Sequence, residues 1–305
     1  MHSRERLRAL DIRRVTRPAP AGPRIAIVEE YSVRQMAERY LDVLWDDGQH
    51  KRHVGAFLGE IDEILRGRCF HSFSEEMVDE IIGALRAKGN SNATVNRKMA
   101  ALSKLLRKAL KMGDLVSIAE FRRQKEKAGR IRFLEPEEEA RLFGEILALS
   151  EDAWRLSVFL VDSGARLGEA LGLKWNDLHP RHATFWITKS GRSRTVPLTR
   201  RAADAVHAVR GTGEPGPFTM LNQQKYRAIW NLAKERCHLG SDADVVPHIL
   251  RHTCASRLVQ GGIDIRRVQM WLGHRTLTVT MRYAHLATND LDCCVSILEQ
   301  APAAE

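Results

Sequence analysis

Apolar residues recur at helical spacing over the first third of the chain. From Ser32 to Leu110 they return every three or four positions, which places them on one face of successive α-helices. Four helices are predicted there, and the fourth covers about residues 94–112 with Gly113 beyond its end, a common way for a helix to stop. Because no strand pattern interrupts these helices, residues 28–115 are predicted to form one compact helical domain.

Helical spacing returns after residue 130 and is interrupted by one hairpin. Residues 184–188 and 194–198 are rich in β-branched and aromatic residues and are predicted to be strands, with Lys189 in the turn between them. Helices are predicted from Glu135-Pro136, over about residues 153–161, around 200–210, over 223–238 and through the closing part of the chain. The predicted fold class is therefore mainly α with a small antiparallel β-sheet.

These patterns divide the chain into four parts. They are an arginine-rich arm (1–27), the helical domain (28–115), a basic linker (116–130) and a second domain with a C-terminal tail (131–305). The arm is either a segment that contacts a partner or a solvated tail, and its composition leaves both interpretations open.

Charge favours a polyanionic partner. The net charge is +10 and the pI is about 9.6, so nucleic acid is the first candidate and a merely basic surface is the alternative. The five cysteines are odd in number and contain no CxxC pair, which disfavours a disulfide framework or a zinc site. No apolar run approaches the roughly 20 residues of a membrane span, and no secretory leader pattern opens the chain. We therefore expect a soluble cytoplasmic protein without a membrane partner.

Basic side chains line one face of the fourth predicted helix. Arg97, Lys104, Lys108 and Lys111 are spaced 7, 4 and 3 residues apart, which aligns them along the helix. No acidic residue separates them, so contact with DNA phosphates is the hypothesis. A face that simply carries solvated lysines is the alternative.

The stretch from Pro247 to Tyr283 brings together arginine, several imidazoles and a phenol. Metal-dependent nucleases use clustered carboxylates, but this stretch holds only Asp264. A tyrosine nucleophile with arginines at a phosphate is the consistent alternative. Most tyrosines merely pack in cores, so the case for Tyr283 depends on its companions.

Five boxes in the second domain resemble, in order, the signatures of the tyrosine recombinase or phage integrase family. They are residues 163–173 around Arg166, the hairpin with Lys189, His248-Ile249-Leu250-Arg251-His252, Leu272-Gly273-His274 and Arg282-Tyr283-Ala284-His285. Residues 92–110 also look like the end of the family's core-binding domain. The resemblance implies a helical, SAM-like core-binding domain and a catalytic domain that together form a two-domain clamp around DNA.

The resemblance also implies a role for each site residue. Arg166 and Arg251 would clamp the non-bridging oxygens of the scissile phosphate, for which a planar, permanently charged guanidinium is suited. Lys189 would protonate the departing 5′-oxygen. His248 would accept or help move the proton of the tyrosine, and His274 would hydrogen-bond the phosphate. Tyr283 would attack it and form a 3′-phosphotyrosine.

Neighbouring residues are expected to support this set without touching the phosphate. His252 and His285 are interpreted as structural or supporting histidines. Glu169 lies three residues after Arg166 and would orient its neighbours, although a solvated carboxylate is nearly as good an interpretation. The resemblance implies no metal and no cofactor.

The function implied is that of a site-specific recombinase that integrates or excises a phage or mobile element. Its partner would be double-stranded DNA, bound by a homotetramer on two sites in the nucleoid, with room for DNA-bending accessory proteins. The C-terminal tail would dock on a neighbouring subunit or pack on its own domain. A type IB topoisomerase-like relaxing enzyme and a catalytically silent DNA-binding regulator are the alternatives. A histidine-metal hydrolase is disfavoured by the missing acidic cluster.

Overall fold

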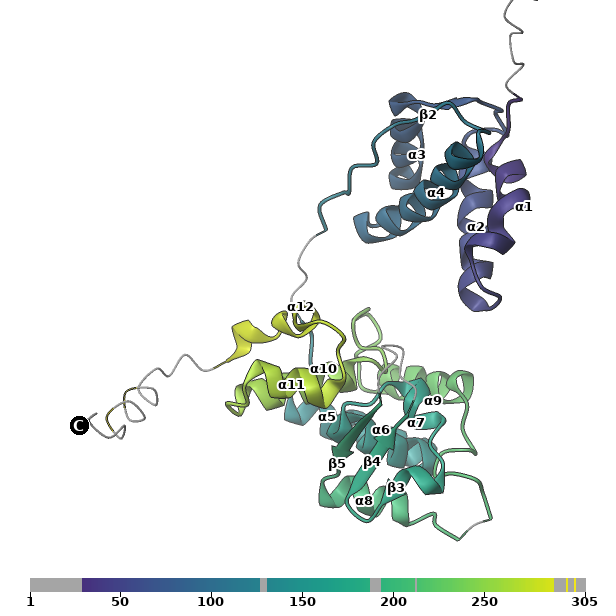
Figure 1. Cartoon of the computed structure of the whole chain (residues 1–305). Coiled ribbons are helices and arrows are strands. Elements are labelled where there is room, and N and C mark those ends of the chain that lie inside the picture. Colours follow the sequence, from purple (N-terminus) through teal and green to yellow (C-terminus); the bar gives the residue numbers. More distant parts are fainter. Residues whose placement is uncertain are drawn as a thin grey trace, which may run out of the picture. The chain divides into compact units, whose positions relative to one another are not determined.

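The computed structural model describes residues 29–126, 131–186, 193–211 and 213–287, together with Val295 and Glu299. Its contacts divide the chain into two compact units, residues 1–128 and 129–305 (Figure 1). Three predicted features lie outside the described residues: the basic arm 1–27, the turn with Lys189, and most of the tail after residue 287.

Four amphipathic helices build the N-terminal unit, as the apolar spacing predicted. They are α1 (Val33–Leu44), α2 (Gln49–Ile64), α3 (Glu75–Ala87) and α4 (Asn92–Met112). Ser32, Ser74 and Ser91 cap α1, α3 and α4 by accepting a hydrogen bond from a backbone N–H in the first turn. The apolar faces meet around Leu58 and Leu102, and each such fully buried leucine stabilises the fold by roughly 1.5–3 kcal/mol.

Two short strands complete this unit, so the prediction that no strand interrupts the helices was wrong. β1 (Ser72–Phe73) pairs in parallel with β2 (Ser117–Ile118). Strands of two residues carry no alternation that a sequence pattern could reveal. Beyond β2, the ring of Phe121 stacks on that of Phe73 with 5.9 Å between the centroids. Part of the segment predicted as a linker therefore packs against the helical unit.

The C-terminal unit is mainly helical and contains one three-stranded sheet. Its helices are α5 (Pro136–Leu149), α6 (Glu151–Ser163), α7 (Leu167–Leu171), α8 (Arg200–His207), α9 (Gln223–Arg236), α10 (Ile249–Gln260), α11 (Ile265–Leu272) and α12 (Leu277–Met281), with 3₁₀ turns η1 (Trp175–Asp177) and η2 (Ala284–Leu286). The strands β3 (Leu178–His179), β4 (His182–Phe185) and β5 (Arg194–Pro197) pair antiparallel in the order β3-β4-β5. β4 and β5 form the predicted hairpin, whereas β3 was not predicted.

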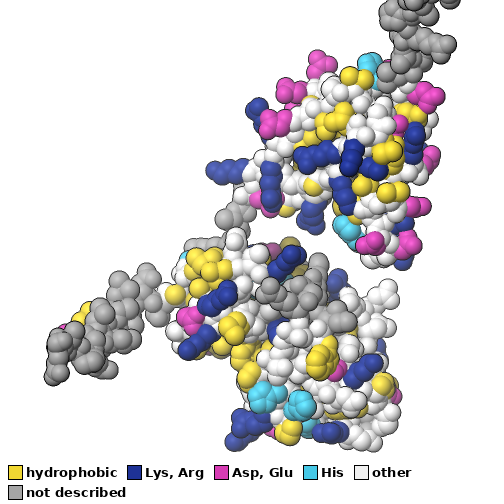
Figure 2. Space-filling model, viewed as in Figure 1, with side chains coloured by type: hydrophobic (Ala, Val, Ile, Leu, Met, Phe, Trp, Pro, Cys, Tyr) yellow, Lys and Arg dark blue, Asp and Glu magenta, His cyan; other side chains and the backbone are white. Residues whose placement is uncertain are grey.

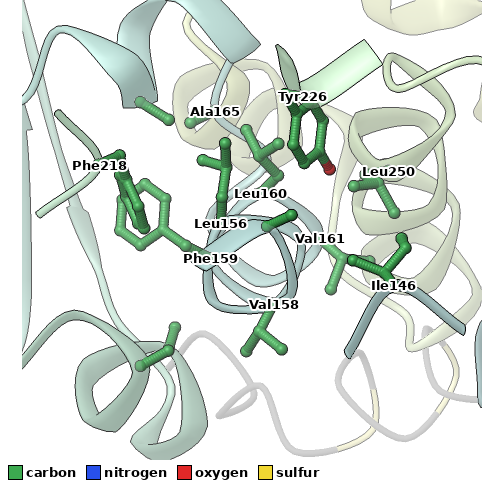
Figure 3. Packing of buried hydrophobic residues seen from close by; sticks show 14 of the residues in the cluster. Ile146, Leu156, Val158, Phe159, Leu160, Val161, Ala165, Phe218, Tyr226 and Leu250 are labelled. Carbon is green, nitrogen blue, oxygen red and sulfur yellow. The ribbon is translucent and has the colours of Figure 1, made fainter. Parts of the chain in front are cut away.

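Helix α6 is packed on several sides in the core of this unit. Figure 3 shows its residues Leu156, Phe159 and Leu160 among side chains of other elements, including Phe218 and Leu250. The rings of Phe159 and Phe218 lie 5.3 Å apart between centroids. The C-terminal end of α6 is therefore fixed in the core, and the first arginine box begins there.

Candidate active site

Gly164 brings the end of α6 into close contact with two helices from the far end of the sequence. Its φ of +62° is the left-handed conformation that favours glycine. A Cβ at this position would lie 2.8 Å from Cδ2 of Leu272 and 3.1 Å from Sγ of Cys254. Only a residue without a side chain therefore lets α10 and α11 approach the start of α7, where Arg166 is the N-cap.

Arg166 is held by a carboxylate that also binds a second arginine. Its Nη1 lies 2.6 Å from Oε1 of Glu169, and Oε2 of Glu169 lies 2.7 Å from Nη2 of Arg194. Burial alone would raise the pKa of Glu169, but the hydrogen bond and charge of Arg194, together with Arg166, outweigh it and lower this pKa to about 2. Glu169 is thus a buried anion, with its side chain 8% exposed, that pairs with two arginines.

Arg251 is buried, with an exposed fraction of 2%. Its Nη1 donates to the carbonyl of Gly164 and its Nη2 to the carbonyl of Leu272, both at 2.6 Å. Burial, reinforced by the charges of Arg166 and Arg194, lowers the pKa of Arg251 to about 9, so the group stays cationic at neutral pH. Two of the five N–H donors of this guanidinium therefore fix its position between α6 and α11.

Two of the predicted histidines lie in the field of these arginines. His274 Nδ1 is 2.9 Å from Oγ1 of Thr280, which orients the ring. Burial and the charges of Arg251 and Arg166 lower the pKa of His274 to about 3 and that of His248 to about 4. Both imidazoles are therefore neutral at pH 7 and can accept a proton or a hydrogen bond.

Tyr283 is buried against the third histidine. Its exposed fraction is 2%, and its hydroxyl lies 2.6 Å from Nδ1 of His252. Burial raises the pKa of Tyr283, whereas burial and the charge of His248 lower the pKa of His252 to about 4. A neutral imidazole is a hydrogen-bond acceptor for the phenol. Among the described residues His252, and not His248, contacts the tyrosine; the ring of His248 lies edge-on to that of His252 with 4.9 Å between centroids.

The structure thus assembles five of the six residues predicted to be catalytic, and the sixth, Lys189, lies outside the described residues. Sequence reasoning did not single out Arg194, although it lies in the hairpin box. An arginine that opens a strand resembles an ordinary exposed edge residue, and only the packing of α11 against β5 buries it.

The basic face of α4 belongs to the N-terminal unit and is described within that unit alone. Arg97 and Lys111 are exposed, whereas Lys108 is partly buried with Nζ 5.9 Å from the ring centroid of Tyr40. Lys104 is also exposed, but its Nζ lies 4.4 Å from the ring centroid of Trp45. Figure 2 shows Lys and Arg side chains gathered on the visible face of this unit.

A groove of about 780 Å³ opens beside α4. Its basic lining residues are Arg97, Lys104, Arg107, Arg122 and Arg123. Arg107 was not included in the predicted stripe, although it lies three residues after Lys104 and four before Lys111. The spacing argument therefore found two of the five basic residues that line this groove, Arg97 and Lys104.

Two kinds of feature are missing from the described part of the chain. In those ranges no three His, Cys, Asp or Glu side chains lie together as a metal site would require. None of the helices in the same ranges is long and apolar enough to cross a bilayer.

Comparison with known proteins defines the class as site-specific tyrosine recombinases. The model of the phage integrase family matches residues 132–290, more than half of the chain. The chain therefore belongs to the phage integrase family, and its activity is that of a site-specific tyrosine recombinase.

Individual relatives extend over both units. The chain is 29% identical to the tyrosine recombinase XerC of Mycobacterium bovis, over 86% of this chain and 94% of that protein. It is 27% identical to the integrase of Escherichia phage P2, over 84% of this chain and 75% of that integrase.

Solved structures agree in fold. The lambda integrase dimer bound to a COC′ core site superposes with a TM-score of 0.73 at 17% identity, covering 84% of this chain and 78% of that chain. The Tn1549 transposon integrase in complex with transposon right end DNA superposes with a TM-score of 0.70 at 18% identity, covering 89% of this chain and 100% of that chain. The predicted fold class is therefore confirmed.

Proposed function

We propose that this protein cuts and rejoins double-stranded DNA through a covalent bond to Tyr283. The phenolic oxygen attacks the scissile phosphorus, a 3′-phosphotyrosine forms, and the bond to the 5′-oxygen breaks. The 5′-hydroxyl of the partner strand then attacks this link and releases the tyrosine. The observation that carries the proposal is the burial of Tyr283 beside neutral His252, in the field of Arg251.

Fixed cations suit the charge that this reaction develops. Negative charge grows on the non-bridging oxygens during attack, and preorganised donors stabilise it without rearranging. Arg166 and Arg251 would supply these donors. Glu169 fixes Arg166, and two backbone carbonyls fix Arg251. His274, oriented by Thr280, would add a hydrogen bond to the phosphate.

The protons need an acceptor and a donor. A phenol with a raised pKa must lose its proton as it attacks, and His252 is the base in contact with it, with His248 next in line. The alkoxide leaving group needs an acid, and the resemblance assigns this to Lys189. Lys189→Ala should slow cleavage, and a 5′-bridging phosphorothioate, whose thiolate leaves without a proton, should restore it. Failure of that rescue would remove the general-acid role.

The substrate is proposed to be a site that joins a mobile element to its host DNA, bound by four copies of the chain. The phage P2 and Tn1549 relatives support the mobile element. One neighbour in fold is a lambda integrase tetramer bound to a Holliday junction, which supports a tetramer on two sites. DNA-bending accessory proteins would fit the same reaction. A bacterial chromosome site is the second candidate, because the XerC relative from Mycobacterium covers most of this chain.

The test uses duplexes from the DNA that flanks the gene, nicked near the candidate cleavage positions so that cleaved product cannot be resealed. Wild-type protein should form a covalent adduct that resists denaturant, and Tyr283→Phe should form none while still binding the duplex. An adduct with the phenylalanine variant, or none with wild type on any flanking duplex, would contradict the proposal.

The same duplexes separate the alternatives. Rejoining to a different strand indicates a recombinase, relaxation of supercoiled DNA without exchange indicates the topoisomerase-like alternative, and binding without an adduct indicates a silent regulator. The positions of the cuts distinguish a mobile-element junction from a chromosome site.

A further inference from the structure

Arg194 contacts parts of the site that are far apart in the sequence. Its Nη2 lies 2.7 Å from Oε2 of Glu169, and its Nε donates to the carbonyl of Trp271 at 3.1 Å. Its guanidinium carbon lies 4.5 Å from the ring centroid of Phe185, the residue opposite it in the β4–β5 ladder. One side chain therefore joins the hairpin, the start of α7 and the end of α11.

The packing around Arg194 leaves it little freedom. Its side chain is 7% exposed. Gly273, which ends α11 with φ of +66°, passes so close that a Cβ there would lie 2.8 Å from Cδ of Arg194. The neighbouring carbonyl, that of Leu272, is bound by Arg251. Arg194 and Arg251 thus hold the consecutive carbonyls of Trp271 and Leu272, and only Gly273 separates these from His274.

We propose that Arg194 is a positioning residue of the recombination site: it fixes Arg166 through Glu169, and it fixes the turn before His274 through the carbonyl of Trp271. The inference rests on the proposed function and adds a residue to it. Its Nε and Nη2 are engaged with Trp271 and Glu169, whereas its Nη1 is buried without a hydrogen-bond partner among the described residues.

The electrostatic consequence follows from the groups that face Glu169. These are Arg166 from the start of α7, Arg194 from β5 and Arg251 from α10. Burial raises the pKa of Glu169, and Arg194 contributes most to lowering it to about 2. Without Arg194 this pKa should rise, because burial remains and the main opposing charge is gone. Glu169 would then be protonated at a higher pH than in the wild-type protein, and its hold on Arg166 would weaken as the pH falls.

The experiment measures single-turnover adduct formation between pH 5 and 8 on the nicked duplex that wild type cleaves. Arg194→Met should slow it by about 10²-fold, the scale of a small misplacement of catalytic groups, and the rate should fall further as the pH drops. Arg194→Lys should also be slow, since lysine lacks the planar fork whose Nε and Nη2 bind Trp271 and Glu169, but its positive charge should keep the profile flat. Arg181→Met, on the exposed turn of the same sheet, is the matched control and should behave like wild type.

A double-mutant cycle distinguishes positioning from general support of the fold. In the Glu169→Gln background the rate should no longer fall as the pH drops. Arg194→Met should slow cleavage by less there than in the wild-type background, because its effect on Arg166 is already lost while its contact with the carbonyl of Trp271 remains. The cycle with Arg194→Lys decides the question if the methionine variant does not fold, as judged by urea unfolding. A wild-type rate and flat profile in the Arg194 variants, or fully additive effects in the cycle, would overturn the inference. Absence of an adduct with wild type would instead refute the proposed function.

Discussion

The hydroxyl of Tyr283 meets a histidine that is unable to hold a proton at neutral pH. The pKa of His252 is lowered to about 4, so the ring is neutral down to pH values near 5, and the tautomer with its proton on Nε2 can accept at Nδ1 from the phenol. As the pH falls through 4 the imidazole becomes protonated and this acceptor is lost. The contact holds the tyrosine in place, and under the proposed function it would also receive the proton of the phenol during attack.

Replacing His252 tests that double role. His252→Phe keeps a ring but removes the acceptor, and should slow adduct formation by about 10²-fold, the low end of general-base effects. His252→Gln retains an acceptor oxygen and should lose less. His182→Gln, on an exposed strand position, is the control and should leave the rate unchanged. If His252→Phe cleaves normally and His248→Phe does not, the proton goes to His248 instead.

At the scale of elements, the close packing at the end of α6 depends on Gly164, which lies two residues before Arg166. Gly164→Ala introduces a Cβ into a left-handed residue and against Leu272 and Cys254. The backbone strain alone costs about 1–2 kcal/mol, and the crowding adds to it. We expect a lower urea midpoint and slower cleavage, because Arg166 follows two residues later. Gly144→Ala in α5 has open space and should stabilise by about 0.5–1 kcal/mol; equal behaviour of the two variants would contradict the argument.

The basic face of α4 leads to a prediction about the salt dependence of DNA binding. Arg97 and Lys111 are exposed, so each replacement by Gln should lower the slope of log K against log salt for DNA binding by about 1. Lys51→Gln is the matched control, since that lysine is already paired with Asp42 and Asp47. Unchanged slopes for Arg97→Gln and Lys111→Gln would indicate that the stripe is only a solvated face.

Elements differed in how far the sequence could predict them. Long helices were predictable because many apolar positions repeat; the α4 prediction of residues 94–112 differs from the structure only at its start. β1, β2 and β3 were missed because two residues carry no period. Resemblance to family motifs identified most of the site residues, but it did not identify the side chains and carbonyls that contact them. The contact of His252 with Tyr283 and the bridging by Arg194 arise from tertiary packing between segments up to 77 residues apart.

Over the whole molecule, the net charge of +10 and the proposed nucleophile Tyr283 together bear on the assembly. Under the proposed function each copy would cut one strand with its Tyr283, so exchange between two duplexes would require four cuts and hence four copies. A chain of this charge is repelled by its own copies in free solution, and DNA screens that repulsion. The assembly should therefore form on DNA rather than before it.

Mass measurement on DNA tests this count. With the duplex that wild type cleaves, the Tyr283→Phe protein should give particles with the mass of four 34.6 kDa chains and two duplexes, because binding persists while cleavage is blocked. Without DNA the same protein should be smaller, and a scrambled duplex serves as the control for non-specific loading. The complex should dissociate steeply as the salt concentration rises, because binding to phosphates releases counterions from the DNA. Complete strand exchange by particles that never exceed two chains would contradict a tetramer.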